Sequence, residues 1–217
     1  MNHPDINKTP ISIPQYHLTE IEDDLIFNLL FDTNLGILLS LAETYGIRRV
    51  PGLSKRDAIF RILRGLHPSD LVELKNEVIA ARYGLLGVEE LLTLLAETDS
   101  GGEQRVAPRM DQITHEEARL VSRETAYWVY TMRGYDVLVD RANRSLSCGC
   151  TYFSFSARRG GLCKHLVTVF QLMPEVYARE ILLDLLLTRR YGGANTKGWQ
   201  FIALQPEPGG GELDVAA

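Results

Sequence analysis

All three cysteines of the chain lie in one short window that also holds a histidine. Cys148 and Cys150 form a Cys-Gly-Cys pair, and twelve residues later Cys163 and His165 form a Cys-Lys-His pair. Thiolate sulfur and imidazole nitrogen are preferred zinc ligands, and a structural zinc site takes four of them in a tetrahedron. The pattern therefore predicts one structural Zn²⁺ with a closed Cys3His ligand set, formed by Cys148, Cys150, Cys163 and His165.

Two other interpretations of the cysteines stay open at this point. Free cysteines are commonly buried as small apolar residues, and a Cys-x-Cys pair can be a redox couple. The redox interpretation is disfavoured because such a disulfide closes a strained ring and no thioredoxin-like βαβ pattern surrounds it. An odd number of cysteines builds no disulfide framework, so we expect a reducing, cytoplasmic location, or the nucleus of a eukaryote.

The same residues argue against a catalytic metal. A catalytic zinc site keeps one position open for water, usually beside three protein ligands. Four suitably spaced ligands leave no such position, no glutamate stands beside them as a base, and no H-E-x-x-H motif occurs. Phosphate-binding loops, dinucleotide fingerprints and nucleophile elbows are also missing from the sequence. We expect a protein that is not an enzyme and that takes no small-molecule substrate.

Local structure must bring the two ligand pairs together. The Cys-Gly-Cys pair follows a strand pattern, in which residues i and i+2 point to the same face. Cys163 is expected just before the first turn of a helix, with His165 inside that turn. The insert between the pairs carries Tyr152, Phe153 and Phe155, which we expect to pack over the ion and exclude water.

These residues resemble the SWIM-type zinc finger. The resemblance rests on the two ligand pairs with their spacing, on Leu166, Val167 and Val169 after them, and on the preceding YDVLVDRANRSLSCGC, and it covers about residues 126–173. It implies a ββα finger that binds DNA or partner proteins, with the same four ligands. Many members carry proline and aspartate after the second cysteine; this chain has Thr151-Tyr152-Phe153, which predicts an atypical loop surface.

Hydrophobic periodicity around the finger predicts an α+β protein: an N-terminal helical bundle followed by a small ββα zinc-binding module and a C-terminal helix. Strand patterns occupy the module, with Arg133-Gly134 as a turn between two of them. Ser54 is expected to cap one helix and Ser69 or Asp70 the next. The expected helices are 20–31, 35–45, 54–64, 69–79, 87–97, 115–122, 163–173 and 175–190, and the expected strands are 126–132, 135–140 and 145–148.

The same pass predicts the domain organisation. A flexible lead over 1–16 precedes a helical domain over 17–97, and a linker over 98–113 leads to the zinc-finger module with its flanking helices over 114–190. A disordered tail is expected over 191–217, in which Trp199 and Phe201 could dock. No apolar run reaches the ~20 residues that span a bilayer, and no secretory signal is visible, so no membrane partner is expected.

Charge is unevenly distributed along a chain whose net charge is −5. Six basic residues against one acid lie over 47–64, and seven against three lie over 121–165. The segment 35–64 also resembles the small helical modules of the SAP and Rho N-terminal types, which implies nucleic-acid contact. These stretches predict contacts with nucleic acid, for which DNA is expected, through Arg48, Arg49, Lys55, Arg56, Arg158, Arg159 and Lys164.

Each basic stretch also has a simpler explanation. The charges over 47–64 fit the solvated faces of an ordinary helical bundle, in which Arg61 and Arg64 pair with the acidic stretch around Glu22 to Asp24. Arg158 and Arg159 either offset the single negative charge of a Cys3His zinc centre or face phosphate. The sequence thus predicts a zinc-finger protein that binds nucleic acid. The alternative is a protein–protein adaptor, for example in a recombination-mediator assembly, with the apolar helix over 175–190 as its interface.

Overall fold

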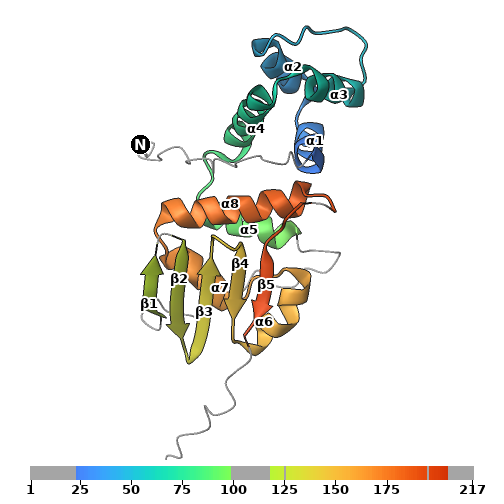
Figure 1. Cartoon of the computed structure of the whole chain (residues 1–217). Coiled ribbons are helices and arrows are strands. Elements are labelled where there is room, and N and C mark those ends of the chain that lie inside the picture. The colour runs from blue at the N-terminus through green and yellow to red at the C-terminus, as the bar shows by residue number, and fades with distance from the viewer. Residues whose placement is uncertain (1–22, 99–117, 125, 195, 205–217) are drawn as a thin grey trace, which may run out of the picture. The chain divides into compact units, whose positions relative to one another are not determined.

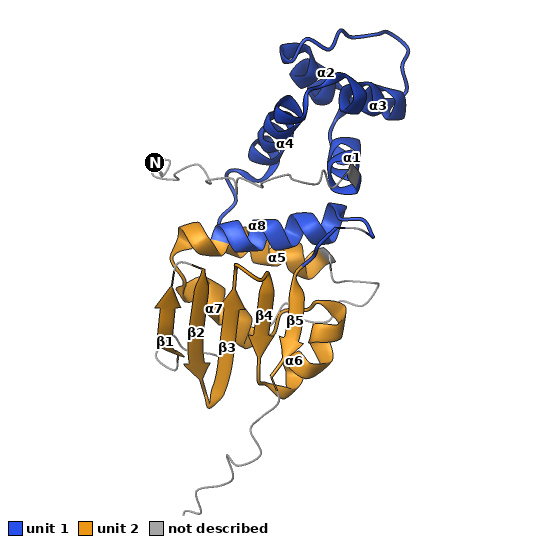
Figure 2. Ribbon diagram, in the orientation of Figure 1, with its two compact units in different colours: residues 1–87, 179–198 blue, residues 88–178, 199–217 orange. Residues whose placement is uncertain are grey.

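The computed structural model describes residues 23–98, 118–124, 126–194 and 196–204 (Figure 1). The chain divides into two compact units, residues 1–87 with 179–198 (unit 1) and residues 88–178 with 199–217 (unit 2; Figure 2). Each unit therefore combines two separate stretches of sequence, which differs from the predicted boundaries near 97 and 190. The predicted lead, residues 99–113 of the predicted linker and residues 205–217 of the predicted tail lie outside the described residues.

Unit 1 is helical, as its periodicity predicts. It contains α1 (Asp23–Asp32), α2 (Leu35–Thr44), α3 (Lys55–Gly65), α4 (Pro68–Tyr83) and, from Arg179, most of α8 (Glu175–Tyr191). Leu29, Leu38, Ile59 and Leu74 are among its fully buried side chains.

Two helix starts in unit 1 test the capping predictions. Ser54 caps α3 as expected: its hydroxyl accepts from the Asp57 amide at 3.2 Å and donates to the Asp57 carboxylate at 2.6 Å. The prediction for α4 is wrong, because this helix begins earlier, with His67 as N-cap and Pro68 in the first turn. Proline fits that turn well, since its fixed φ is helical and its missing N–H would be unpaired there anyway.

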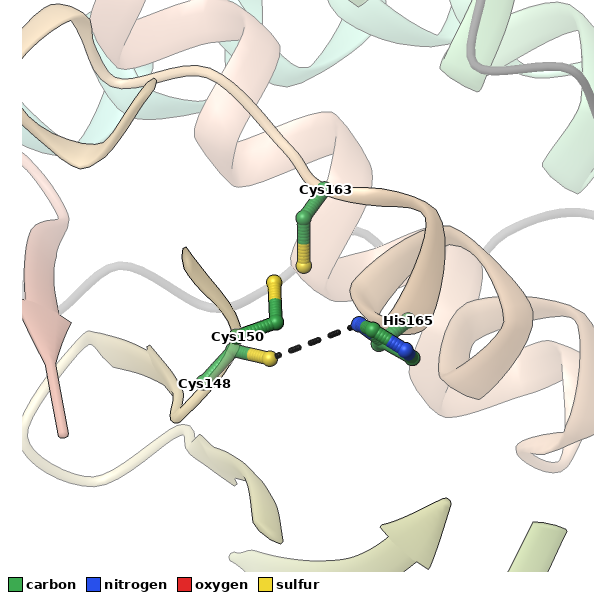
Figure 3. A group of neighbouring side chains, drawn as sticks. All are labelled: Cys148, Cys150, Cys163 and His165. Atoms are coloured by element: carbon green, nitrogen blue, oxygen red, sulfur yellow. Dashed lines mark hydrogen bonds between the residues drawn. The ribbon is translucent and has the colours of Figure 1, made fainter. Parts of the chain in front are cut away.

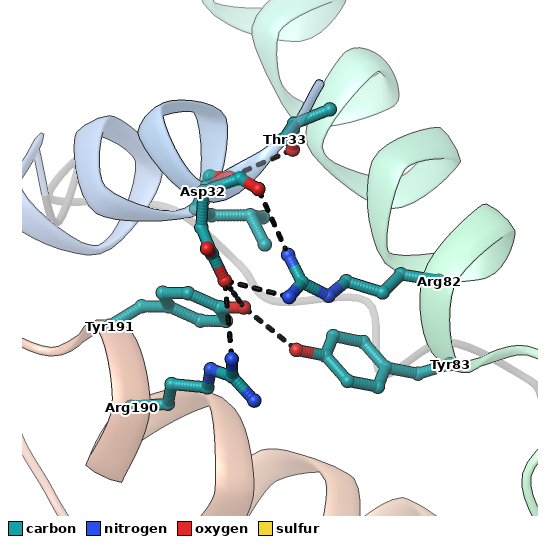
Figure 4. Close-up of polar contacts among 7 residues, drawn as sticks. Asp32, Thr33, Arg82, Tyr83, Arg190 and Tyr191 are labelled. Carbon is teal, nitrogen blue, oxygen red and sulfur yellow. Dashed lines mark hydrogen bonds and ion pairs between the residues drawn. The ribbon is translucent and has the colours of Figure 1, made fainter. Parts of the chain in front are cut away.

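A polar network ties three helices of unit 1 together at Asp32 (Figure 4). The Asp32 carboxylate accepts from the Tyr191 hydroxyl at 2.8 Å and pairs with Arg82 at 2.7 Å and Arg190 at 3.5 Å. The hydroxyl of Tyr191 also lies 2.7 Å from that of Tyr83. The ends of α1, α4 and α8 are thus held by one carboxylate.

The apolar side chains of α8 are mostly buried, and the partner interface over 175–190 stays a prediction. The leucines and the isoleucine that made the helix look like an interaction surface are buried, whereas Val176 is exposed. A helix that is apolar nearly all round is stable in water only when those side chains are covered. The buried residues are Ile181, Leu182, Leu183, Leu185, Leu186 and Leu187.

Unit 2 is built on a five-stranded sheet in the order β1-β2-β3-β4-β5. The strands are β1 (Ala118–Glu124), β2 (Tyr127–Met132), β3 (Tyr135–Asp140), β4 (Ser145–Cys148) and β5 (Gln200–Ala203). The first four pair antiparallel with their neighbours, and β5 pairs parallel with β4. The predicted Arg133-Gly134 turn joins β2 to β3 with φ of 48° and 76°, the left-handed geometry that suits a two-residue hairpin.

Helices cover this sheet and carry the connection between its last two strands. α7 (Lys164–Leu172) packs against β3 and β4, and α5 (Val88–Thr98) packs against α7. A short helix, α6 (Thr151–Ser156), and a 3-10 turn, η3 (Ala157–Arg159), follow β4. The predicted strand and helix positions of the zinc module are confirmed.

Two predictions fail at the edges of the sheet. Residues 118–122, expected in an acidic helix over 115–122, belong to the edge strand β1, with a bulge between Leu120 and Ser122; residues 115–117 lie outside the described part of the chain. The predicted disordered tail is wrong over 200–203, where β5 pairs with β4, although Trp199 and Phe201 do dock. In both places hydrogen bonding to a distant strand overrides weak local propensity.

Across the described residues, no single helix has the length and apolarity to cross a membrane; α1 and α2 taken together, with a bend of 119° between them, meet that criterion by length and composition only.

The network at Asp32 makes the stability of unit 1 depend on pH. Burial raises the pKa of the Asp32 carboxyl, but the hydrogen bond from Tyr191 lowers it. The charges of Arg82 and Arg190 lower it further, and the pKa ends below the ordinary value of 3.8. This stabilisation is fully present above that ordinary value and is lost as the pH falls through the lowered pKa of the folded state.

Asp32→Asn is therefore expected to lower the free energy of unfolding by about 1 kcal/mol near neutral pH, a modest value because water screens a part-exposed pair. Denaturant titrations followed by far-UV circular dichroism measure it. The difference from the unmodified protein should shrink towards zero well below pH 3.8. Glu43→Gln, which changes an exposed carboxylate on α2, serves as the control. A deficit of equal size at both pH values would contradict the assignment.

Candidate metal centre

The four predicted ligands converge in unit 2 (Figure 3). Cys148 is the last residue of β4, Cys150 is the N-cap of α6, and Cys163 is the N-cap of α7, with His165 in the first turn of α7. All four are buried, and their ligand atoms lie within 4.8 Å of one another. A strand end and two helix starts thus deliver one Cys3His cluster. Cys150 differs from the prediction in one respect, since it lies beyond the strand and begins a helix.

The cluster has the dimensions and chemistry of a zinc site. In a tetrahedral site with Zn–S of ~2.3 Å and Zn–N of ~2.0–2.1 Å, neighbouring ligand atoms lie about 3.5–3.8 Å apart. Cys148 Sγ lies 3.8 Å from His165 Nδ1, which makes Nδ1 the imidazole nitrogen that faces the sulfurs. Within the described chain the other nitrogen, Nε2, is buried without a hydrogen-bond partner. The cluster could hold one zinc ion, which would supply a structural crosslink between β4, α6 and α7.

Two helix starts stabilise negative charge at the sulfurs. The amide of Phe153 donates to Cys150 Sγ at 3.3 Å, so the thiolate acts as the side-chain cap of α6. Cys163 caps α7 by position but makes no side-chain cap hydrogen bond, which leaves its sulfur directed at the cluster. Amide groups and the helix dipole at an N-terminus favour thiolate over thiol.

In the absence of a cation, the three cysteine thiols have very different pKa values. A hydrogen bond from Cys148, followed by one from Cys163, lowers the pKa of Cys150 well below its ordinary value. The hydrogen bond with Cys150 raises the pKa of Cys148 to about 12, and bonds to Cys148 and Cys150 raise that of Cys163 as well. Cys150 therefore carries the thiolate, whereas Cys148 and Cys163 stay protonated unless a cation displaces their protons.

Aromatic rings enclose the cluster, but not all of those predicted. The Tyr135 ring lies 5.3 Å from the His165 ring, and Phe153 is buried with its ring 6.3 Å from that of Phe201. Tyr152 and Phe155, also expected over the ion, are instead 52% and 74% exposed. The helical turn of α6 explains this, because it directs only one of three successive aromatic positions inwards.

Comparison with known proteins gives one finding for this region. Residues 135–173 match the family model described as SWIM zinc finger. This segment is a SWIM zinc finger. It begins at β3 and ends just after α7, so β1, β2 and β5 extend the sheet beyond the matched finger. The predicted SAP-like and Rho-like segment over 35–64 remains unsupported. No curated protein and no solved structure shows a significant match to the chain.

The predicted nucleic-acid contacts fall into two groups. Within the SWIM finger, Arg158 and Arg159 are exposed on η3, and Lys164 is half-buried at the start of α7. In unit 1, the other four residues lie between the end of α2 and the start of α3, and all are exposed except the half-buried Lys55. These four residues are Arg48, Arg49, Lys55 and Arg56. The contacts of both groups with nucleic acid stay predictions.

Sequence reasoning missed the parts of the site that come from distant strands. Tyr135 covers the imidazole from the start of β3, and Phe201 supports Phe153 from β5. The aromatic residues at 199 and 201 in an otherwise glycine- and proline-rich tail were the available signal for β5. No local pattern indicates that Tyr135 faces the cluster.

Metal content and one substitution test the centre. We expect about one zinc per chain in freshly purified, reduced protein by elemental analysis. Cys150→Ser should abolish it, and because serine still caps α6, the loss isolates the metal bond from the helix cap. Unit 2 should lose several kcal/mol of stability, since metal binding energy is folding energy. Tryptophan fluorescence reports this, because Trp128 and Trp199 both lie in unit 2.

Two results would contradict the assignment: metal-free protein from a reducing preparation, or Cys150→Ser protein with unchanged zinc content. Ser154→Ala, at an exposed position of α6 between the ligand pairs, is the matched control and should keep its metal.

Zinc affinity should depend steeply on pH. Cys148 and Cys163, whose pKa values are raised, hold their protons near neutrality, and zinc must displace both. Affinity should therefore fall as the pH falls, by about 100-fold per pH unit for two displaced protons. Competition with a chromophoric chelator at two pH values measures this after correction for the chelator's own protonation. A pH-independent affinity would contradict the protonated state of these thiols.

Proposed function

We propose that this protein is a zinc-stabilised, non-enzymatic protein that binds nucleic acid in DNA transactions, with the segment between the two ligand pairs as a contact surface. The observation that carries the proposal is the chemistry of that segment. Its ends are fixed at the buried cluster, while Arg158, Arg159, Tyr152 and Phe155 are exposed. A rigid base thus presents cations and aromatic rings to solvent, and three free buried thiols fit a reducing, cytoplasmic location.

Exposure favours phosphate over the zinc centre as the partner of the two arginines. A cation in water gains little from a buried negative charge, because solvent screens the attraction. The start of α6 already supplies an amide hydrogen bond to one of the sulfurs, from Phe153 to Cys150. The charges of Arg158 and Arg159 are therefore available to an outside anion. Guanidinium groups bind phosphate oxygens in a bidentate manner that holds backbone without reading sequence.

The aromatic side chains extend this surface. Tyr152 and Phe155 project from the same short helix that Cys150 begins. Exposed rings next to cations allow contact with sugars and bases in addition to phosphates. Large exposed apolar side chains are unfavourable unless a partner covers them, and Phe155, at 74% exposed, is among the most exposed of those described.

A protein–protein adaptor without DNA contact is the second candidate, and a different observation favours it. The edge strand β1 exposes Leu120 and Val121 beside the bulge. An edge strand with apolar side chains can receive an added strand from a partner.

Fluorescence anisotropy of labelled oligonucleotides separates the two candidates. Arg158→Gln with Arg159→Gln should weaken binding at least tenfold at low salt and reduce the slope of log affinity against log salt by about 1.5. The zinc content should not change, because neither side chain is a ligand. The matched control is Arg119→Gln with Arg123→Gln, two exposed arginines on β1. An unmodified protein that binds no DNA at low salt would overturn the proposal in favour of the adaptor.

A further inference from the structure

We propose that unit 1 carries a second contact surface, on α1 and α3, which binds unpaired bases of single-stranded nucleic acid. The proposal rests on the proposed function only in taking nucleic acid as the ligand; it uses different residues in a different unit. Three phenylalanines and three cations make up the surface, here named the ring cluster: Phe27, Phe31, Phe60, Lys55, Arg56 and Arg64.

The rings form one contiguous group. Phe27 and Phe31, one turn apart on α1, have ring centroids 6.0 Å apart at an interplanar angle of 18°. Phe60 of α3 lies 5.5 Å from Phe27 at 41°. Phe31 is 49% exposed and Phe60 is 37% exposed, whereas Phe27 is half-buried between them. Two exposed rings are thus held in place by a third that is partly anchored.

Cations lie against both exposed rings. Lys55 Nζ is 5.3 Å from the centroid of Phe31. The guanidinium carbons of Arg56 and Arg64 are 5.6 Å and 5.8 Å from the centroid of Phe60. Arg56, Phe60 and Arg64 follow one another at intervals of four residues, so one face of α3 alternates cation, ring and cation.

These cations are not neutralised by carboxylates of the described chain. Among the side chains that the structure describes, no ion pair joins a carboxylate to Lys55, Arg56 or Arg64. The nearby Asp57 accepts from the Ser54 hydroxyl, and Asp32 at the end of α1 is committed to the network with Arg82. The ring cluster therefore keeps positive charge beside apolar rings.

Single-stranded nucleic acid matches this combination of groups. Unpaired bases stack on aromatic rings and on guanidinium planes, while cations hold the intervening phosphates. A duplex offers phosphates but keeps its bases stacked on one another, so it can use the cations and not the rings. An acidic apolar peptide could also bind here, because its carboxylates would pair with the cations and its apolar side chains would pack on the rings. Binding of such a peptide is therefore the competing outcome.

The test uses the full-length protein loaded with zinc and labelled strands of about 15 nucleotides, a length within the range of single-strand sites. The probes are an oligothymidylate, a duplex of the same length and an abasic strand with the same phosphates. Phe31→Leu with Phe60→Leu keeps apolar bulk but removes both rings. We expect it to weaken oligothymidylate binding about tenfold and to change duplex and abasic binding by less than about twofold.

Two further variants provide controls. Phe31→Trp with Phe60→Trp should retain or strengthen oligothymidylate binding, which a merely structural role of the phenylalanines would not explain. Leu85→Ala removes an exposed apolar side chain outside the ring cluster and should have no effect. Circular dichroism confirms that each variant is folded.

The outcomes separate this inference from the proposed function. If Arg158→Gln with Arg159→Gln weakens binding but Phe31→Leu with Phe60→Leu binds oligothymidylate normally, the inference about the ring cluster is overturned and the proposed function stands. If the phenylalanine substitutions weaken oligothymidylate binding and the arginine substitutions do not, the ring cluster stands. The segment between the two ligand pairs is then overturned as a contact surface. Equal binding of abasic and thymidylate strands by the unmodified protein overturns stacking. Binding of an acidic peptide but of no strand at the ring cluster also overturns the inference.

Discussion

Three thiols and an imidazole buried within 4.8 Å of one another are the constraint on which unit 2 depends. Hydrogen bonds among the three sulfurs raise the pKa values of Cys148 and Cys163 and lower that of Cys150, so without a cation only one sulfur carries charge. A divalent ion removes the conflict by accepting all three sulfurs as thiolates. A bound zinc ion would therefore add its binding energy to the packing of the buried core in stabilising the finger.

The sheet and two helix starts hold the ligands where that bond requires them. β4 is paired on both sides, by β3 and β5, so the position of Cys148 does not depend on its short strand alone. Cys150 and Cys163 each begin a helix, and the amide dipoles of both helices point towards the sulfurs. Tyr135 and Phe153 then cover the site. Strand pairing, helix polarity and aromatic packing thus act on the same four atoms.

The two ligand pairs fix the ends of the segment between them, and its exposed residues take no part in the metal site. Only Phe153 of its three aromatic residues is needed inside, so Tyr152, Phe155 and the two arginines are available for a partner. In unit 1 the ring cluster combines the same groups on helices α1 and α3. Two surfaces of similar chemistry on one chain would let weak, salt-sensitive contacts add up to useful affinity.

The spacing of cysteines and histidine determined the metal, the ligand set and the strand-then-helix frame, because ligand chemistry and backbone periodicity are local properties. The strands at 127–148 and the helices from Lys164 to Tyr191 follow from the same local rules. Only the tertiary structure decided that 118–124 is a strand, that β5 joins the sheet, and that Tyr135 and Phe201 enclose the site. It also decided that the leucines of α8 are core and that three phenylalanines gather under cations. These features depend on contacts between residues far apart in the chain, whose energies no local pattern contains.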